Sequence, residues 1–167
     1  VMEAVRAIHD EPIPSAMNAL AGMIGASDGS TELLRRVLNA NYRLGTAASA
    51  VKLAAFASRE SAVPEMRAEA LEMLGQWGQP DPRDRVLNAY RPVEDRDPVV
   101  AKKALEPHVA SLITAPELVR EKTIDVASRL GISGIAPVLV NRVSDSELAP
   151  STRAASLSAL NRLDPKG

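Results

Sequence analysis

The stretch RAEALEMLGQW at residues 67–77 places apolar side chains three residues apart, at Leu71, Leu74 and Trp77. Steps of three put side chains on one face of an α-helix. The same pattern returns in REKTIDVASRL at 120–130 and in RAASLSALNRL at 153–163. The repetition predicts that one helical building block recurs along the chain.

A fixed period of 33 residues relates five such helices. Val5, Leu38, Leu71, Ile124 and Leu157 take equivalent positions, at separations of 33, 33, 53 and 33 residues. A recurring period of this length is typical of an α-solenoid, in which a helical hairpin buries its apolar face only against its neighbours. The one longer separation indicates 20 extra residues, and we place this insertion at 78–97.

The predicted fold is therefore all-α, an α-solenoid of about four helical hairpins in a single domain over residues 1–167. Aromatic residues make up only 2% of the chain, which argues against an all-β fold. We expect helix pairs at 14–24 with 31–44, 46–59 with 64–77, 98–113 with 116–130, and 135–144 with 150–163. Residues 1–9 would be the second helix of a partial unit, so we expect the chain to belong to a larger protein.

Local signals refine these helices. Asp97 before Pro98 predicts a capped helix start, and the spacing from Thr114 to Glu117 is that of a capping box. Pro107 falls inside the helix at 98–113, which should be kinked or split there. The stripe predicts burial of a set of core side chains, namely Leu71, Leu74, Ile124, Leu157 and Leu160.

The repeats resemble the HEAT-like helical repeats of bacteria, including the type found in phycobilisome lyases. Two features carry the resemblance: an Arg-x-x-Ala/Thr/Ser-Leu/Ile block at Arg67, Arg120 and Arg153, and a proline in the first helix at Pro107 and Pro137. The resemblance implies a HEAT-type solenoid. It does not imply one activity, because helical solenoids serve many unrelated tasks.

The segments at 77–92 and 96–113 resemble a narrower group, the helical-repeat region of planctomycete-type exported proteins. These multidomain proteins combine a membrane-bound or sorbosone-type dehydrogenase with a cytochrome c domain. The resemblance implies a periplasmic or exported location and places the redox chemistry elsewhere in the parent protein. It assigns no catalytic or haem-binding residue to this chain.

Charge and composition exclude several classes of function. The net charge is −1, from 20 Lys and Arg against 21 Asp and Glu, so the bulk charge does not favour nucleic acid or a membrane surface. The chain has no cysteine, which excludes thiolate metal sites and covalent haem attachment. We expect no cofactor, no nucleic-acid partner and no direct membrane contact.

Neither metal ligation nor catalysis is predicted from the polar residues. The two histidines, His9 and His108, are about three units apart, too far for one metal ion, and we interpret them as packing or surface residues. Glu94, Asp95 and Asp97 lack the spacing of a calcium loop. No serine has a histidine at a recurrent spacing, so the segment is not expected to be an enzyme.

The insertion at 78–97 is the segment in which we expect specific contacts with a partner. Asp81-Pro82 followed by Asp84 predicts a short helix over 82–89, anchored by Val86 and Leu87. The candidate interaction residues are Arg83, Arg85, Tyr90, Arg91 and Arg96. An equally weighted alternative is that the segment only bridges a longer gap between two units.

Two functions from different classes follow. The first is a non-catalytic scaffold that binds a protein or neighbouring domains of the same chain. The alternative is a HEAT-like enzyme module, of the chromophore lyase or DNA glycosylase type. A concave cleft that combines Asp or Glu with an exposed Tyr or Trp would favour the enzyme.

Overall fold

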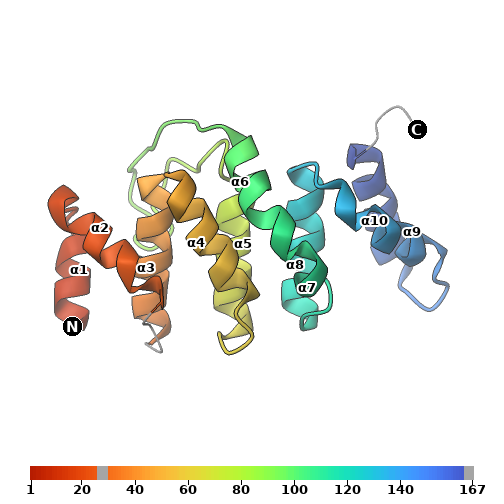
Figure 1. Cartoon of the computed structure of the whole chain (residues 1–167), viewed down its shortest axis with the longest axis horizontal. Coiled ribbons are helices and arrows are strands. Elements are labelled where there is room, and N and C mark those ends of the chain that lie inside the picture. Colours follow the sequence, from red (N-terminus) through yellow and green to blue (C-terminus); the bar gives the residue numbers. More distant parts are fainter. Residues whose placement is uncertain (26–29, 164–167) are drawn as a thin grey trace.

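A computed structural model describes residues 1–25 and 30–163 of the chain. These residues form α-helices joined by short connections, except for one long non-helical segment at 78–97 (Figure 1). No β-strand occurs among them, and the one isolated β-bridge joins Arg83 to Tyr90. The predicted all-α class is confirmed.

The first half of the chain contains the helices α1 to α5. Their bounds are α1 (Met2–Asp10), α2 (Pro14–Gly22), α3 (Thr31–Leu44), α4 (Ala47–Ser58) and α5 (Pro64–Gly75). A short 3-10 turn, Met23–Gly25, extends α2. Proline begins α2 and α5, where a missing backbone N–H leaves no hydrogen bond unmade.

The second half begins with a helix interrupted at proline. The pieces are α6 (Pro98–Leu105), a 3-10 turn (Glu106–His108) and α7 (Val109–Leu112). Pro107 lies in the turn, which confirms the predicted break, since proline cannot donate the bond that a continuous helix requires. The remaining helices are α8 (Glu117–Arg129), α9 (Ala136–Ser144) and α10 (Pro150–Leu163), with a 3-10 turn, Ser133–Ile135, before α9.

The helix ends show which capping signals operate. The Asp97 side chain accepts a hydrogen bond from the Val99 N–H at 2.9 Å, as predicted. The predicted capping box at Thr114 is wrong: Pro116 precedes α8, and the Thr114 hydroxyl instead donates to the Ser111 carbonyl at 2.8 Å. Thr114 lies in the turn that follows α7, and its hydroxyl is directed back to that helix and not to the first turn of α8.

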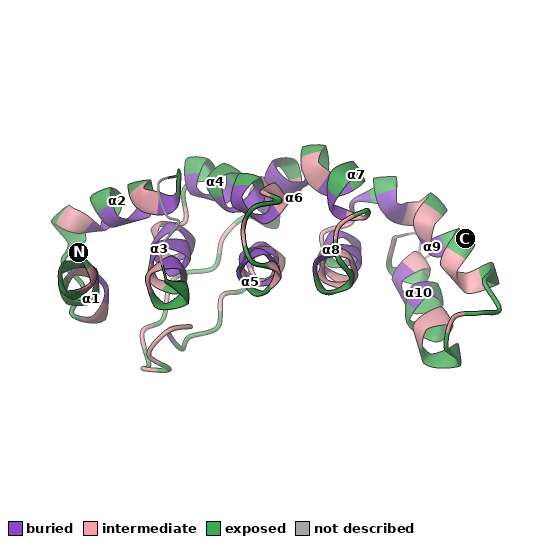
Figure 2. Cartoon of the chain, turned by 90° about the horizontal axis from the view of Figure 1, so that it is seen from below, coloured by how far each residue is buried: buried purple, intermediate pink, exposed green. Residues whose placement is uncertain are grey.

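The helices lie in two rows that alternate along the chain. Figure 2 shows α2, α4, α6, α7 and α9 in one row and α1, α3, α5, α8 and α10 in the other. Buried residues lie mainly between the rows and between neighbouring helices, where α4 packs on α5 and α6, and α5 packs on α8. The core is thus one continuous layer along the molecule.

The predicted core is correct in the interior and wrong at its C-terminal end. Leu71, Leu74 and Ile124 are buried. Leu157 is 58% exposed and Leu160 is only half-buried. In α10 the small residues Ser156 and Ala159 face the interior instead, because α10 has α8 and α9 as its helical neighbours and no described helix on its other side.

Candidate functional site

The inserted segment at 78–97 does not contain the predicted helix over 82–89. Asp81 accepts a hydrogen bond from the Arg83 N–H at 2.7 Å, and the chain then reverses so that Arg83 pairs with Tyr90. Asn88 has a φ of 55°, a left-handed conformation that ends the turn. The aspartates therefore cap turns and not the first turn of a helix.

Asp84, and not Val86 or Leu87, anchors this hairpin. Its side chain is 0% exposed, whereas those two apolar residues are only half-buried. One carboxylate oxygen accepts hydrogen bonds from the N–H groups of Val86 (2.9 Å) and Leu87 (3.0 Å). The other accepts a bond from the Asn39 amide nitrogen of α3 at 3.0 Å and lies 3.5 Å from an Arg43 guanidinium nitrogen.

These contacts set the charge of Asp84. Burial raises the pKa of a carboxyl group because it disfavours the charged form. The backbone N–H donors of Leu87 and Val86 act in the opposite direction, and the net result is a pKa below the usual range. Asp84 is therefore an ionised, buried link between the hairpin and α3.

His9, at the end of α1, extends the same cluster. The side chain is buried, its Nδ1 lies 2.8 Å from an Asp10 carboxylate oxygen, and its Nε2 lies 2.8 Å from the Asn39 amide nitrogen. Asp10 in turn pairs with Arg36 at 2.8 Å, and the hydrogen bond from Arg36 is the largest influence that lowers the Asp10 pKa. His9 is thus held by hydrogen bonds in a polar core, which agrees with its interpretation as a packing residue.

Arg91 joins the hairpin to α1. Its guanidinium donates to the backbone carbonyls of His9, at 3.3 Å, and Asp10. These carbonyls belong to the last turn of α1, where intrahelical donors are lacking and a positive charge is favourable. A residue expected to contact a partner therefore caps a helix of its own chain.

Arg96 fills the space between the ends of α3 and α5. Its guanidinium carbon lies 4.8 Å from the centre of the Tyr42 ring and 4.4 Å from that of Trp77, distances typical of cation–π contacts. One nitrogen donates to the Tyr42 carbonyl at 2.6 Å. A Cβ at position 45 would lie 2.9 Å from an Arg96 nitrogen, so only glycine leaves room for this guanidinium. Gly45 also has a φ of 65°, which glycine adopts without strain.

The five candidate interaction residues thus fall into two groups. Arg85 pairs with Glu69 of α5 at 2.9 Å, so that it, Arg91 and Arg96 all contact the helices. Arg83 and Tyr90 form no hydrogen bond or ion pair with the described helices: Arg83 is exposed and its guanidinium donates to the Asn88 carbonyl of the same hairpin at 2.9 Å, and the Tyr90 side chain is 72% exposed. Contact of any of the five with a partner stays a prediction.

The helices that face the hairpin form a shallow polar groove with it. The groove has a volume of ≈ 450 Å³ and is lined by α3, α5 and the hairpin. Arg35, Arg83 and Glu69 lie along it. Its lining is more polar than that of an ordinary small-molecule pocket, which is mainly apolar.

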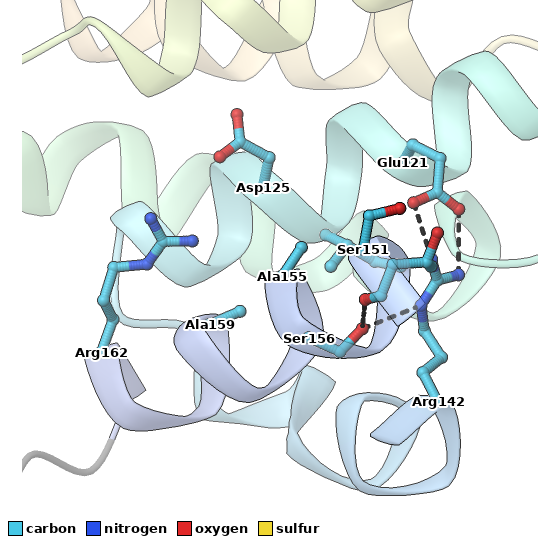
Figure 3. Close-up of a pocket in the computed structure, with 10 residues that line it drawn as sticks. Glu121, Asp125, Arg142, Ser151, Ala155, Ser156, Ala159 and Arg162 are labelled. Atoms are coloured by element: carbon cyan, nitrogen blue, oxygen red, sulfur yellow. Dashed lines mark hydrogen bonds and ion pairs between the residues drawn. The ribbon is translucent and has the colours of Figure 1, made fainter. Parts of the chain in front are cut away.

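A second groove of ≈ 300 Å³ lies where α10 meets α8 and α9 (Figure 3). Glu121 and Arg142 form a two-pronged ion pair at one end, with distances of 2.8 and 2.9 Å. Ala155 and Ala159 line the floor, and Arg162 lies at the other end. The groove exists because α10 turns small side chains toward α8.

Charged residues of neighbouring helices pair with one another along the row. Glu72 of α5 contacts Lys122 (2.8 Å) and Arg129 (3.0 Å) of α8. Arg129 also contacts Asp125 one turn earlier in the same helix, at 2.8 Å. Burial raises the pKa of Glu72, but the hydrogen bonds from Lys122 and Arg129 outweigh it and hold this pKa below the usual range.

The aromatic side chains separate into buried and exposed ones. Trp77, Tyr42 and Phe56 are buried in the core, as expected for Trp77 from its place in the repeat. Tyr90 is exposed on the hairpin, outside the helical stripes. The described grooves do not combine a carboxylate with an exposed ring of Tyr or Trp in their lining.

Within residues 1–25 and 30–163, no group of three or more histidines and carboxylates is arranged to hold a metal ion. In the same part of the chain, no helix combines the length and the apolar character that crossing a bilayer requires. The sequence matches no protein-family model, no curated protein and no solved structure. Both family resemblances therefore remain predictions.

The sequence did not predict that Asn39, Asn41 and Asp84 hold the polar core together, and Asp84 was interpreted as part of a helix cap. Asn41 donates to the carbonyls of Ala21 and Val37, each at 2.9 Å, and so links α3 to α2. A signal was present, because two asparagines in the apolar stripe LNANY at 38–42 are unusual for a buried helix face. Their partners, however, lie far away in the sequence.

Proposed function

We propose that this chain is an α-solenoid of HEAT-like hairpins that serves as a non-catalytic scaffold for a protein or for neighbouring domains of its own polypeptide. The two alternating rows of helices support this architecture, as does the 33-residue spacing of the buried residues Val5, Leu38 and Leu71. Each hairpin packs mainly on hairpins next to it in the chain. Such arrays present long, continuous surfaces to partners.

The observation that carries the proposed function is the surface formed by the hairpin and the groove between it, α3 and α5. Arg35 and Arg83 are exposed in the groove lining, and Tyr90, outside the lining, is exposed at the hairpin position that pairs with Arg83. Tyrosine and arginine are enriched in protein interfaces because each combines a large contact area with a polar group. A folded hairpin whose exposed side chains are already held in place loses little entropy when it binds.

A catalytic role has less support. The expected sign of an enzyme was a cleft that combines Asp or Glu with an exposed Tyr or Trp, and the lining of the described grooves contains neither Tyr nor Trp. The carboxylates Glu69 and Glu121, which line two of the described grooves, pair with arginines, and Trp77 is buried. We therefore do not adopt the lyase or glycosylase alternative.

Site-specific photo-crosslinking in the cells that make the protein tests the scaffold function. A photoreactive amino acid replaces Tyr90 or Arg83 on the hairpin. As matched controls, it replaces Val51 or Lys52, which are exposed on α4 in the other row. We expect a discrete crosslinked species from the hairpin positions only. Equal crosslinking from both rows, or none from either, would contradict the proposed site.

Small-angle X-ray scattering of the purified chain tests the architecture separately. A two-row solenoid gives an elongated particle whose distance distribution has a long tail. A compact, near-spherical distribution would overturn the solenoid. Membership of an exported dehydrogenase–cytochrome protein is a further prediction, and the sequence of the parent protein decides it.

A further inference from the structure

Arg67 of α5 is a buried cation without a carboxylate partner. Only 4% of the residue is exposed. Its Nε donates to the Ala57 carbonyl at 2.7 Å, and within residues 1–25 and 30–163 its two terminal nitrogens form no hydrogen bond or ion pair. Burial lowers the pKa of this guanidinium, and the negative charge of Glu60 only partly opposes the effect. Buried charges in proteins are normally paired, so Arg67 lacks the anion that its position calls for.

The two terminal nitrogens of Arg67 reach solvent through a pocket. They are not among the fully buried side-chain atoms that lack a partner, so some of their surface is accessible. Arg67 lines a pocket of ≈ 300 Å³ between the α4–α5 connection and the α7–α8 connection. Figure 1 shows these two connections at the edge of the molecule opposite the inserted segment. The pocket is therefore separate from the groove beside the hairpin.

The equivalent arginines of the later units have different surroundings. Arg120, 53 residues after Arg67, has a side chain that is 38% exposed and lies 3.4 Å from a Glu121 carboxylate oxygen. Arg153, a further 33 residues on, is half-buried. Burial without a carboxylate partner is thus a property of the Arg67 position and not of the repeat.

The N-terminus of α8 adds positive charge at the same pocket. Ala115 and Pro116, the two residues before this helix, line the pocket, and no side chain caps the helix start. The first N–H groups of a helix carry a partial positive charge and attract anions. The helix end and the Arg67 guanidinium therefore favour a negative group in one place.

Three hydroxyl groups line the pocket and are oriented as hydrogen-bond acceptors. Each donates its hydrogen to a backbone carbonyl of its own segment and keeps lone pairs free for another donor. The bonds run from Ser58 to Ala55 (2.9 Å), from Ser111 to His108 (2.9 Å) and from Thr114 to Ser111 (2.8 Å). A ligand that carries an O–H or N–H group beside its negative charge suits such a lining.

We propose that this pocket binds the carboxylate of a small molecule that also carries a hydroxyl or amino group. The Nε of Arg67 is occupied, which leaves its two terminal nitrogens as a planar pair of donors for the two carboxylate oxygens. The pocket has one unpaired guanidinium and also contains Glu60, so it suits a single negative charge better than a phosphate, whose charge is about −1.5 to −2. Its volume is that of a site for a small ligand.

An NMR titration of the purified chain with sodium lactate, at neutral pH and constant ionic strength, tests the proposal. Lactate is a carboxylate with an adjacent hydroxyl. We expect saturable shifts of the Arg67 Nε–H signal and of the amide signals of Thr114 and Ala115. Acetate, which lacks the hydroxyl, should bind roughly 2- to 10-fold more weakly, and inorganic phosphate should bind no better than acetate.

Two variants locate the binding site. Arg67→Lys keeps the charge but loses the planar pair of nitrogens, and it should weaken lactate binding by about 10-fold or more. Arg120→Lys, at the equivalent position of the next unit, is the matched control and should leave the affinity unchanged. Ser111→Phe places a bulky ring at an exposed position of the pocket lining and leaves Arg67 intact. It should abolish binding even if Arg67→Lys does not fold, which circular dichroism melting checks.

The absence of any saturable shift in the wild-type chain would overturn the site. So would an unchanged lactate affinity in a folded Arg67→Lys variant or in Ser111→Phe. Phosphate that binds more tightly than lactate would overturn the assignment of a carboxylate. If lactate does not bind and Glu60→Gln lowers the melting temperature, Glu60 is itself the counter-ion of Arg67.

Discussion

The buried carboxylate of Asp84 lies 3.0 Å from the side-chain amide nitrogen of Asn39, although 45 residues separate them in the sequence. This hydrogen bond joins the hairpin of the inserted segment to the middle of α3. It lies beside the contacts of Arg43 and His9 with the same carboxylate. The insertion is therefore part of the folded core and not only a surface loop.

Replacing Asp84 with alanine should destabilise the protein by about 3 to 5 kcal/mol, because Arg43 and Asn39 lose their buried partner. Urea unfolding followed by circular dichroism measures this change. Asp81→Ala is the control on the same hairpin, since Asp81 is exposed and accepts one backbone hydrogen bond. Asp81→Ala should lower the free energy of unfolding by at most about 1 kcal/mol. Equal effects of the two substitutions would contradict the role assigned to Asp84.

Replacing residues 78–97 with a short Gly and Ser linker should lower the melting temperature by roughly 10 °C. The linker removes Asp84, the cap that Arg91 places on α1, and the contacts of Arg96 with Tyr42 and Trp77. Tyr90→Ser, within the intact segment, should change the melting temperature by less than about 2 °C. An unchanged melting temperature of the linker variant would mean that the segment only binds partners, as its first interpretation required.

Leu71→Ala should lower the free energy of unfolding by about 2 to 5 kcal/mol, because apolar burial is lost and a cavity is left behind. The equivalent substitution Leu157→Ala should cost less than about 1 kcal/mol, because the side chain is already 58% exposed. Urea unfolding followed by circular dichroism measures both changes. Similar costs at the two positions would show that α10 packs in the register of α5 and buries its leucines.

Protonation of Asp10 at low pH should lower the free energy of unfolding. Its hydrogen bond with Arg36 holds the pKa of the folded carboxyl below its usual range. A lowered pKa contributes stability that is present above the unfolded pKa of about 3.9 and is lost as the pH falls through the folded pKa. Urea unfolding at about pH 5 and about pH 3 measures the loss. Arg36→Gln should reduce that loss, whereas an unaltered pH dependence would contradict the assignment.

The helices could be predicted from the sequence because their signals are local. Apolar residues at steps of three predicted the helical faces, and proline predicted where helices begin and break. Pro107 splits its helix and Gly45 ends α3 with a positive φ, as their chemistry requires. Each of these outcomes depends on residues within one or two helical turns.

The candidate site could be predicted only in outline. The segment at 78–97 was identified as an insertion, but its aspartates were interpreted as helix caps. Aspartate caps turns as well as helices. Which of the two forms depends on the tertiary contacts that hold the segment. Here Asn39, Arg43 and the carbonyls at the end of α1 hold it, and all of them are distant in the sequence.

The sequence by itself determined the helical class and the positions of the helices, since the spacing of apolar side chains and the backbone limits of proline and glycine act within a few residues. Only the tertiary structure decided that Asp84 and not Val86 anchors the hairpin, that Arg91 and Arg96 serve their own chain, and that Leu157 faces outward. Burial depends on which helix lies alongside. A stripe of leucines is the same in sequence whether a neighbour covers it or not.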